Sequence, residues 1–506
     1  MADPKGKEFR VNTYTLDRQE APAIAMDAAG NFVVTWDLKQ DGSSRGIDRG
    51  VYAQRYTKNG KAVGAEFRVN TTIDKSQAEP DIAMAPGGNF VVVWEGYGND
   101  PSKGKNADSD RGIFAQRYNS AGVRLGAEFQ INTTIAKAQD NPKVAIDAKG
   151  NFVTVWGSDS TGINYNLYAQ RFNAQGMAQG GEFLVATTRI AGGTQADVAM
   201  DAKGNFVVTW AKQGVNDPEN SVWAKRYDRN GDVLGKAFLV DSFDRGGSGK
   251  PAVDMNAAGN FVVSWYGGDG DIFARRYNHL GASQGGTRLV TSSGNNPDVV
   301  LGTDGDFVVT WTARNGIKAR HFDKNNTPQS ADQVSTTRAN PFEPGAIAID
   351  DAGNYTVAWQ GSVDRDDNIY AQRFAETGNS NNIKGTASAD QLRGTNGNDM
   401  LTGLGGNDQL VGNSGNDQLL GGVGRDVLIG GLGADRFVLQ DNAGVDKIQD
   451  FENNQDKLVL SGSLTFGALN FTQIGNTTLI SQETTVLAQL TGVSATQLNA
   501  ADFILQ

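Results

Sequence analysis

Cysteine is absent from the 506-residue sequence, and histidine occurs only twice, as His279 and His321. Disulfides, thiolate metal sites and cysteine nucleophiles are therefore excluded, and a zinc centre built from several histidines is not expected. No stretch approaches the roughly 18 apolar residues of a membrane span. The N-terminus also lacks the apolar run of a secretory signal. Any metal bound by this chain is expected to take oxygen ligands.

Positive charge is also scarce, because 57 Asp and Glu outnumber 46 Lys and Arg and give a formal net charge of −11. Nucleic-acid binding draws on clustered basic side chains, so we expect no nucleic-acid partner and consider hard cations better candidates. Proline is sparse at 12 residues, whereas 64 glycines and 38% hydrophobic residues fit a loop-rich globular protein. The length indicates more than one domain.

The N-terminal three quarters of the chain consist of repeats. A segment of the type Gly-Asn-Phe-Val-Val-Thr-Trp, first found at residues 30–36, occurs seven times at intervals of 46 to 62 residues. Each copy lies among three further apolar runs, such as residues 80–84, 113–118 and 66–70. Short β-branched and aromatic runs bounded by Gly, Asn and Asp are typical of strands. Four strands repeated seven times predict an all-β fold, a seven-bladed β-propeller.

The two ends of the repeat array predict how the ring closes. The chain opens with the fourth strand of a unit, at residues 8–12, and the last unit stops after its third strand, at residues 369–374. We therefore predict that the N-terminal strand completes the seventh blade, so that no blade edge is left open.

The repeated tryptophans end the second strand of each unit, beside variable loops that are common places for binding sites. We interpret them mainly as packing wedges between blades, and the alternative is a ring of aromatic platforms for sugars. The candidate ligand-binding residues on this face are Trp94, Asp108 and Asp110, the last two in the long loop at residues 95–111. A repeated arginine of the third strand, first seen as Arg55, is expected to bind a carboxylate or a carbonyl between blades.

After residue 378 the composition changes and a nine-residue period begins. Each unit has the form Gly-Gly-x-Gly-x-Asp-x-apolar-x. Glycines permit a tight turn with inward carbonyls, and the aspartate supplies an anionic oxygen of the kind that calcium prefers. Two units make one coil, so aspartates 18 residues apart stack and are expected to hold calcium between them. The six candidate ligands are Asp390, Asp399, Asp408, Asp417, Asp426 and Asp435.

These repeats resemble the RTX, or repeats-in-toxin, family of calcium-binding parallel β-rolls, over residues 385–438. The resemblance implies that main-chain carbonyls also bind the metal. The implied positions are Gly403, Gly405, Gly412, Ser414, Gly421 and Val423. The first units depart from the family pattern at Thr386, Ser388 and Thr395, so the outermost site, at Asp390, differs most from it.

The segments that follow the repeats also resemble the RTX family. Residues 434–460 look like the cap of its β-roll, and residues 501–506 look like its uncleaved C-terminal export signal. The resemblance implies secretion by type I machinery and an extracellular or cell-surface location, which replaces the cytoplasmic location suggested by the missing N-terminal signal. The expected domains are a propeller at 1–378, a β-roll with its cap at 379–460 and an export-signal region at 461–506.

For the propeller, the sequence leaves three classes of function open. The favoured one is a lectin-like or adhesin-like protein that binds surface glycans or a partner protein. The second is an extracellular polysaccharide lyase or hydrolase, and the third is a surface-layer or fibril component. No blade carries a conspicuous acid, base and nucleophile that the others lack, so no catalytic residue is assigned, and whether the chain is an enzyme stays open with binding favoured.

Overall fold

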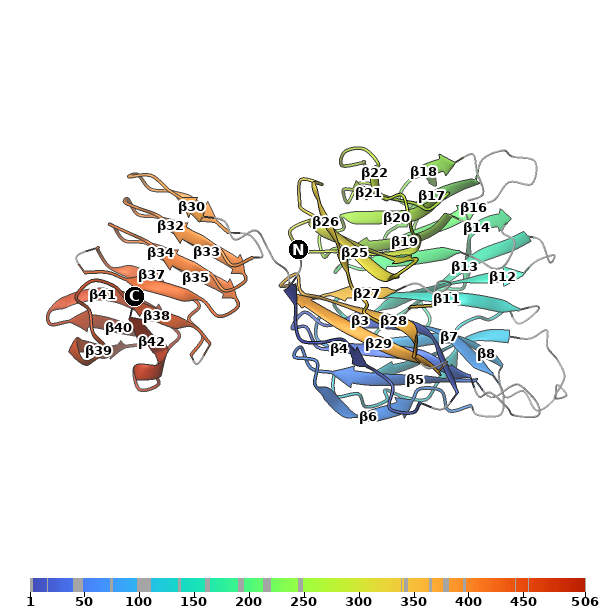
Figure 1. Cartoon of the computed structure of the whole chain (residues 1–506), viewed down its shortest axis with the longest axis horizontal. Helices are drawn as coiled ribbons and strands as arrows, with labels where there is room; N and C mark the ends of the chain where they lie inside the picture. Colours follow the sequence, from blue (N-terminus) through green and yellow to red (C-terminus); the bar gives the residue numbers. More distant parts are fainter. Residues whose placement is uncertain are drawn as a thin grey trace. The chain divides into compact units, whose positions relative to one another are not determined.

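The computed structural model describes most of the chain, in ranges that begin at residue 3 and end at residue 505. The described ranges are 3–15, 17–39, 49–72, 76–97, 111–134, 138–159, 164–189, 195–212, 220–243, 249–337, 339–340, 345–363, 366–375, 382–394, 397–441, 443–453 and 455–505. The chain divides into two compact units, residues 1–375 and 376–506 (Figure 1). None of the described residues forms a helix with the length and hydropathy of a membrane span.

Unit 1 is a seven-bladed propeller, as predicted, and each blade is an antiparallel sheet, with its strands in sequence order in blades 1 to 6. The innermost strands are β3 (Arg18–Met26), β7 (Gln77–Met84), β11 (Gln139–Ile146), β15 (Ala196–Met200), β19 (Gly249–Met255), β23 (Asn295–Leu301) and β27 (Ala346–Ile349). The second strands are β4 (Phe32–Lys39), β8 (Phe90–Tyr97), β12 (Phe152–Asp159), β16 (Phe206–Lys212), β20 (Phe261–Gly268), β24 (Phe307–Ala313) and β28 (Tyr355–Val363).

The remaining strands complete the blades on their outer side. The third strands are β5 (Arg49–Tyr56), β9 (Arg111–Tyr118), β13 (Asn164–Phe172), β17 (Asn220–Tyr227), β21 (Asp271–Tyr277), β25 (Gly316–Phe322) and β29 (Asp366–Ala375). The outer strands of blades 1 to 6 are β6 (Ala62–Arg68), β10 (Phe129–Gln130), β14 (Phe183–Arg189), β18 (Phe238–Phe243), β22 (Arg288–Thr291) and β26 (Pro328–Gln333). Consecutive innermost strands pack against one another, and β27 packs against β3, so the ring is closed.

The repeated Gly-Asn dipeptide forms the hairpin between the first two strands of a blade. In blade 1, Gly30 has a φ of +86°, a conformation that favours glycine. The carboxylate of Asp27 accepts hydrogen bonds from the backbone N–H groups of Ala29 and Asn31, at 3.0 and 2.8 Å. The side-chain oxygen of Asn31 in turn accepts from the N–H of Lys58 at 3.1 Å. The motif therefore fixes both the turn and its contact with the third strand.

The N-terminus closes the seventh blade, which confirms the predicted closure. Strand β2 (Phe9–Arg10) pairs antiparallel with β29, placing Phe9 opposite Ala371. The amide group of Asn12 adds a hydrogen bond, because its oxygen accepts from the N–H of Ile369 at 2.8 Å. A second short strand, β1 (Asp3–Pro4), also pairs with β29 and was not predicted.

In six of the seven blades the repeated arginine joins the blade to the next, as expected for carbonyl pairing, whereas blade 6 has His321, whose Nε2 lies 2.8 Å from Asp306 of the same blade. Arg55 of blade 1 donates to the carbonyl oxygen of Ser120 in blade 2, at 2.7 Å. Arg373 of blade 7 donates to the carbonyl oxygen of Lys58 in blade 1. The same contact therefore crosses the junction at which the ring closes.

Unit 2 is a parallel β-solenoid with two sheets. One sheet contains β30 (Asn382–Lys384), β32 (Met400–Thr402), β34 (Gln418–Leu420), β36 (Arg436–Leu439), β38 (Lys457–Leu460) and β42 (Phe503–Leu505). The other contains β31 (Gln391–Arg393), β33 (Gln409–Ser414), β35 (Val427–Leu432), β37 (Asp446–Ile448), β41 (Thr485–Thr491), β40 (Thr477–Gln482) and β39 (Leu469–Ile474). Two short 3-10 helices, η1 (Phe466–Ala468) and η2 (Ala500–Asp502), lie in its C-terminal part.

The core of the solenoid is a stack of leucines set by the nine-residue period. Leu401 lies opposite Leu419, and Leu410 lies opposite Leu428, and all four are fully buried. The segment expected to hold an export signal belongs to the same core, because β41 pairs with β37 and β42 pairs with β38. Residues 461–506 therefore fold as part of unit 2.

Candidate metal centre

The repeated aspartates form two ladders, one immediately before the strands of each sheet of the solenoid, and we call the two together the aspartate ladder. The backbone N–H of each of the first four aspartates donates to the Oδ1 of the aspartate 18 residues later, at 2.7 to 2.9 Å. The pairs are Asp390 with Asp408, Asp399 with Asp417, Asp408 with Asp426 and Asp417 with Asp435. This is the stacking that the sequence period predicts.

The second oxygen of these carboxylates is available for a ligand. The Oδ2 atoms of Asp408, Asp417, Asp426 and Asp435 are buried and have no hydrogen-bond partner. A Cβ atom on Gly403 would collide with the Oδ2 of Asp408 and with the carbonyl oxygen of Gly421. Glycine therefore keeps open a space that two kinds of oxygen border, and a buried carboxylate oxygen without a partner is costly unless a cation binds it.

Burial makes the charged form of these aspartates unfavourable when no cation is present. It raises the pKa of Asp417 to about 8, and the carboxylates of Asp435 and Asp399 add to the shift. It likewise raises the pKa of Asp435 to about 7, with Asp456 as the nearest contributing acid. A divalent cation between the turns would stabilise the charged forms and offset this cost.

The implied carbonyl ligands lie in the same turns, but some of these residues border open space and others already take part in hydrogen bonds or strand pairing. The carbonyl oxygen of Gly421 borders the space beside Gly403, and that of Gly412 borders the corresponding space beside Gly394. The carbonyl oxygen of Val423 instead accepts a hydrogen bond from the N–H of Gly406, at 2.9 Å. Gly405 forms a parallel bridge with Val423, and Ser414 pairs with Leu432 within the sheet. Among the described residues, no three Asp, Glu or His side chains converge on one point, so each site would need carbonyl oxygens as well.

Of the candidate ligand residues of the propeller, Trp94 is the one that lies among the described residues. Trp94 is 0% exposed, its indole N–H donates to Gln77 at 2.8 Å, and its ring stacks on Phe114. A buried ring offers no face to a sugar, so Trp94 has the packing role and the platform alternative does not fit it. Asp108 and Asp110 lie outside the described residues.

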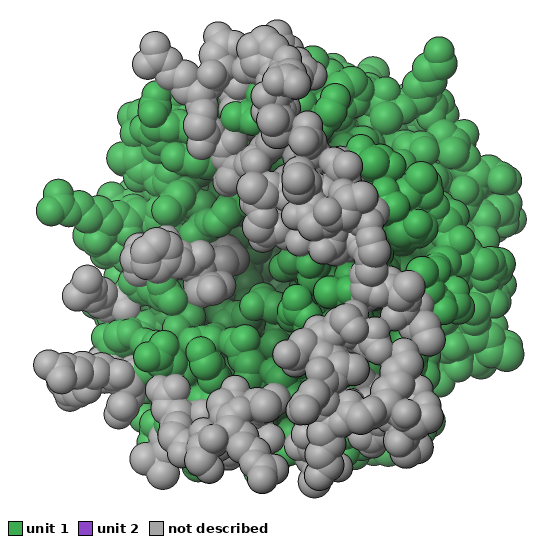
Figure 2. All heavy atoms as spheres, turned by 90° about the vertical axis from the view of Figure 1, so that its right-hand side faces the viewer, with its two compact units in different colours: residues 1–375 green, residues 376–506 purple. Residues whose placement is uncertain are grey.

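The face of the propeller at which the second strands end carries ion pairs between the second and third strands. Figure 2 looks onto this face, which is hollowed near its centre. At the ends of β8 and β9, Arg111 donates to Glu95 at 2.7 Å. At the ends of β4 and β5, the Nε of Arg49 lies 2.9 Å from the Oδ2 of Asp37. Burial raises the pKa of Glu95, although Arg111 opposes the shift. These groups can offer charged hydrogen bonds to a polar ligand.

Comparison with known families decides what the aspartate ladder is. A family model described as the RTX calcium-binding nonapeptide repeat (4 copies) matches residues 377–410 and 411–443. These residues are RTX repeats. Calcium is therefore the metal of unit 2, which we call the RTX unit from here on.

Similar solved structures were also found, whereas no curated protein sequence matches the chain. A protein of unknown function from Dyadobacter fermentans is 12% identical, with 73% of this chain and 98% of that chain covered and a TM-score of 0.45. An α-L-arabinanase from Penicillium chrysogenum has the same identity and coverage and a TM-score of 0.40. A subunit of the mannuronan C5-epimerase from Azotobacter vinelandii is 32% identical, with 24% and 80% covered and a TM-score of 0.21. We infer no function from these similarities.

In the first turn of the RTX unit, the aspartate carboxylate has hydrogen-bond donors from the protein and needs no cation. The Oδ2 of Asp390 accepts hydrogen bonds from the backbone N–H and the hydroxyl of Thr386, at 2.6 and 2.9 Å. In the third to sixth units the corresponding second position is Leu404, Asn413, Gly422 or Gly431, none of which carries a hydroxyl, and the Oδ2 of the aspartate has no hydrogen-bond partner. The departure seen in the sequence therefore replaces a metal contact with an internal hydrogen bond.

The RTX unit extends the aspartate ladder beyond the nine-residue period. Asp446 accepts from the N–H of Asp426 at 3.2 Å, and Asp456 accepts from the N–H of Asp435 at 2.9 Å. Sequence analysis missed both as ladder residues, because their spacings are 20 and 21 residues rather than 18. The available signal was the Asp-x-apolar pattern that both share with the repeats. Asp450 ends the series by accepting from Gly430 and Gly431.

Proposed function

We propose that this chain is a secreted calcium-binding protein whose RTX unit folds on calcium outside the cell and whose propeller binds a surface glycan or a partner protein. The observation that carries the proposal is the row of buried, unpartnered Oδ2 atoms in the aspartate ladder. Four such atoms facing glycine turns are unfavourable in an empty solenoid, and calcium removes the cost by neutralising them.

The proposed sites lie between turns that are stacked two repeats apart. Asp408 and Asp426 would bind one ion, and Asp417 and Asp435 another, with the carbonyl oxygens of glycines completing each shell. Asp399 and the implied carbonyl positions extend the same arrangement along the solenoid. Asp390 is the weakest candidate, since Thr386 already occupies its free oxygen.

Secretion by type I machinery is the second part of the proposal. Phe503 is 8% exposed and Asp502 is 0% exposed, so the C-terminal segment is packed once the RTX unit has folded. An export apparatus would therefore have to recognise this segment in the unfolded chain. Extracellular modules commonly bind calcium with dissociation constants of about 10⁻⁴ to 10⁻³ M, far above the calcium concentration of the cytosol. Folding of the RTX unit would therefore follow export.

The test uses the full-length protein after removal of metal with a chelator. Calcium should increase the β-sheet signal in circular dichroism and protect residues 376–506 from proteolysis, whereas magnesium should have little effect because it demands a smaller, strictly octahedral shell. Asp417→Asn should weaken the calcium response about tenfold or more. Glu483→Gln, which removes the same charge from an exposed turn, should not. Equal protection with and without calcium would contradict the proposal.

The proposed propeller ligand is tested separately. A glycan array and a turnover assay on acidic polysaccharides, both on the calcium-loaded chain, compare binding with catalysis. Binding without turnover supports a lectin-like role, whereas bond cleavage would replace it with the hydrolase or lyase alternative. Calcium-dependent polymerisation would instead favour the surface-layer alternative.

A further inference from the structure

Neighbouring blades are joined at their outer strands in two different ways. In blades 7, 1, 2 and 3, a glutamate beside the outer strand accepts hydrogen bonds from a threonine that follows the outer strand of the preceding blade. We call this contact the carboxylate clasp. It joins Glu8 to Thr336, Glu66 to Thr13, Glu128 to Thr71 and Glu182 to Thr133.

The blades with a carboxylate clasp share a second residue. Their third strand carries a glutamine whose amide donates to a glycine carbonyl of the same blade, or of the closing N-terminal segment, at 3.1 to 3.3 Å. These glutamines are Gln372, Gln54, Gln116 and Gln170. In blades 1 to 3 the glutamine precedes the glutamate by 12 residues.

Blades 4, 5 and 6 replace this arrangement with a cation. Where the other blades have glutamine they carry Lys225, Arg275 and Arg320, which we call the cationic clasp. Each donates backward to a valine carbonyl of the preceding blade, at Val185, Val240 and Val290 respectively. Twelve residues after the first two cations, the glutamate is replaced by Ala237 and Thr287.

Lys225 fits this role less well than the two arginines. Arg275 donates at 2.7 Å to Val240 and also to the hydroxyl of Thr287. Lys225 makes one long hydrogen bond, 3.5 Å, to Val185. The Nζ of Lys225 also lies over the ring of Tyr227, 5.2 Å from its centroid. An ammonium group carries three donors, so Lys225 keeps hydrogen-bond donor capacity beyond its one hydrogen bond to the described residues. Burial also lowers the pKa of Lys225, and no carboxylate opposes the shift.

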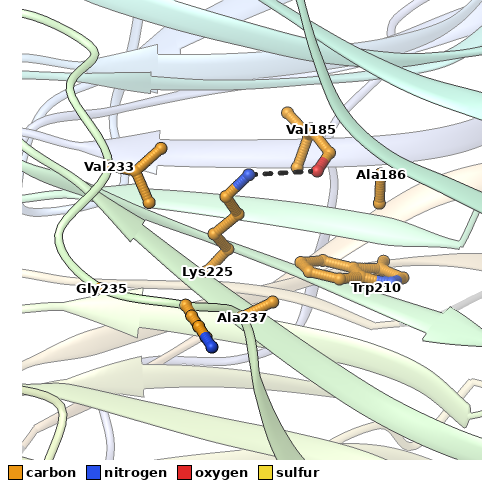
Figure 3. Close-up of a pocket in the computed structure, with 8 residues that line it drawn as sticks. Val185, Ala186, Trp210, Lys225, Val233, Gly235 and Ala237 are labelled. Atoms are coloured by element: carbon orange, nitrogen blue, oxygen red, sulfur yellow. Dashed lines mark hydrogen bonds between the residues drawn. The ribbon is translucent and has the colours of Figure 1, made fainter.

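An open cavity of about 630 Å³ lies at this junction between blades 3 and 4. Figure 3 shows Lys225 between Val233 and Trp210, with its nitrogen directed at the Val185 carbonyl. The other lining residues are Ala186, Gly235, Lys236 and Ala237. None of the eight described lining residues is acidic. The cavity thus combines an apolar wall with an incompletely bonded cation.

We propose that this cavity binds a uronic acid residue of an extracellular polysaccharide, with the sugar carboxylate paired to Lys225 and an apolar sugar face against the side chain of Val233, which is 51% exposed. A site of 300 to 1,000 Å³ with an apolar lining and few polar groups is typical for small organic ligands. The charge specifies an anion, and an aliphatic wall suits the apolar C–H face of a pyranose. The inference rests on the proposed glycan binding by the propeller and names the sugar class for one site.

The test measures binding of trigalacturonate to the calcium-loaded, full-length chain by calorimetry, with its methyl ester as the neutral probe. We expect the ester to bind at least tenfold more weakly than the acid, and added salt to weaken binding of the acid. Lys225→Gln should reduce affinity for the acid at least tenfold. Arg275→Gln, the matched change in blade 5, should leave that affinity unchanged.

A second variant separates folding from binding. In the sequence repeat, Thr187 of blade 3 corresponds to Thr133 of blade 2, although it lies within β14, opposite Asn166. Lys225→Gln with Ala237→Glu gives blade 4 the glutamine and glutamate of the clasped blades and places a carboxylate against the cavity, which Ala237 lines. This double variant should keep the melting temperature of the parent and lose trigalacturonate binding.

The outcomes distinguish this inference from the proposed function. Equal binding of acid and ester, no effect of Lys225→Gln, or stronger binding of an acidic peptide than of trigalacturonate would overturn the uronate site. If one of these contradicting results is obtained but the propeller binds a neutral glycan, the proposed glycan binding stands. Only the uronate inference is then overturned. If the chain binds no glycan at all, both fail.

Discussion

At the scale of single residues, the buried side chains of the propeller bind both within a blade and to the next blade. The repeated tryptophans are 0 to 5% exposed, and in blades 1 to 3 their indole N–H donates to a glutamine of the innermost strand. Aspartates of the innermost strands bind the backbone of the next blade: Asp81 accepts from Val144, and Asp197 accepts from Val253, both at 2.8 Å.

Removing Trp94 should therefore weaken the fold rather than a binding site. Trp94→Ala deletes a fully buried aromatic side chain, and we expect it to reduce the free energy of unfolding by about 3 to 5 kcal/mol. Urea unfolding followed by circular dichroism measures the change, with Val123→Ala, at a 58% exposed position, as the control. A loss below about 1 kcal/mol would contradict the packing role.

Asp197 should make the stability of the propeller depend on pH. Burial raises its pKa to about 7, while Lys143 and the hydrogen bond from Val253 oppose the shift. The folded state then holds this proton more tightly than the unfolded chain, whose aspartate pKa is about 3.9, so stability falls as pH rises from about 4 to 7. Asp197→Asn removes this loss. In excess calcium, the melting temperature of the variant relative to the parent should rise between pH 5 and pH 8, and a constant difference would show that Asp197 does not titrate in this way.

At the scale of elements, one short N-terminal strand completes the ring. Strand β2 covers the edge of β29, the hydroxyl of Tyr56 donates to the carbonyl of Val11 at 3.1 Å, and Glu8 forms the carboxylate clasp of blade 7. The pairing of β2 with β29 and the clasp from Glu8 to Thr336 join residues that are more than 300 positions apart in the chain.

Deleting residues 1–13 should open the ring. The exposed edge of β29 could then pair with another chain, so we expect aggregation or a melting temperature lower by roughly 10 °C. Light scattering and calorimetry in calcium measure the two outcomes. A truncated chain that stays monomeric and melts with the parent would refute the role of β2 in closure.

At the scale of the whole molecule, the two units obtain their stability from different sources. The propeller has apolar clusters that span adjacent blades, whereas the RTX unit joins a leucine stack to a row of buried carboxylates. The apolar core of the propeller needs no ion, and the carboxylate row does.

Chelation should therefore affect one unit and spare the other. Calorimetry of the calcium-loaded chain should show a transition of the RTX unit that chelator abolishes and calcium restores, because binding to the folded state stabilises it by mass action. The propeller transition should keep its midpoint in chelator. A shift of both transitions by the same amount would indicate that the propeller also depends on calcium.

The sequence by itself determined the architecture and the aspartate ladder, because both depend on local periodicity. Glycine at a fixed place in each turn, apolar residues in each strand and aspartates nine residues apart repeat often enough to set blade number, closure and stacking. Asp446 and Asp456 were missed because their spacing leaves the period, although the solenoid continues through them.

Only the tertiary structure decided the roles of residues that act through contacts between blades. Burial assigned Trp94 to packing, and the relation between Lys225 and Ala237 became visible only once each blade lay beside its neighbour. The place of a residue in the repeat gives its position along a strand. Its partner in the next blade lies about 50 residues away in the sequence, and which residue that is depends on how the sheets pack. The cavity between blades 3 and 4 is for this reason a property of the assembled ring and not of any single repeat.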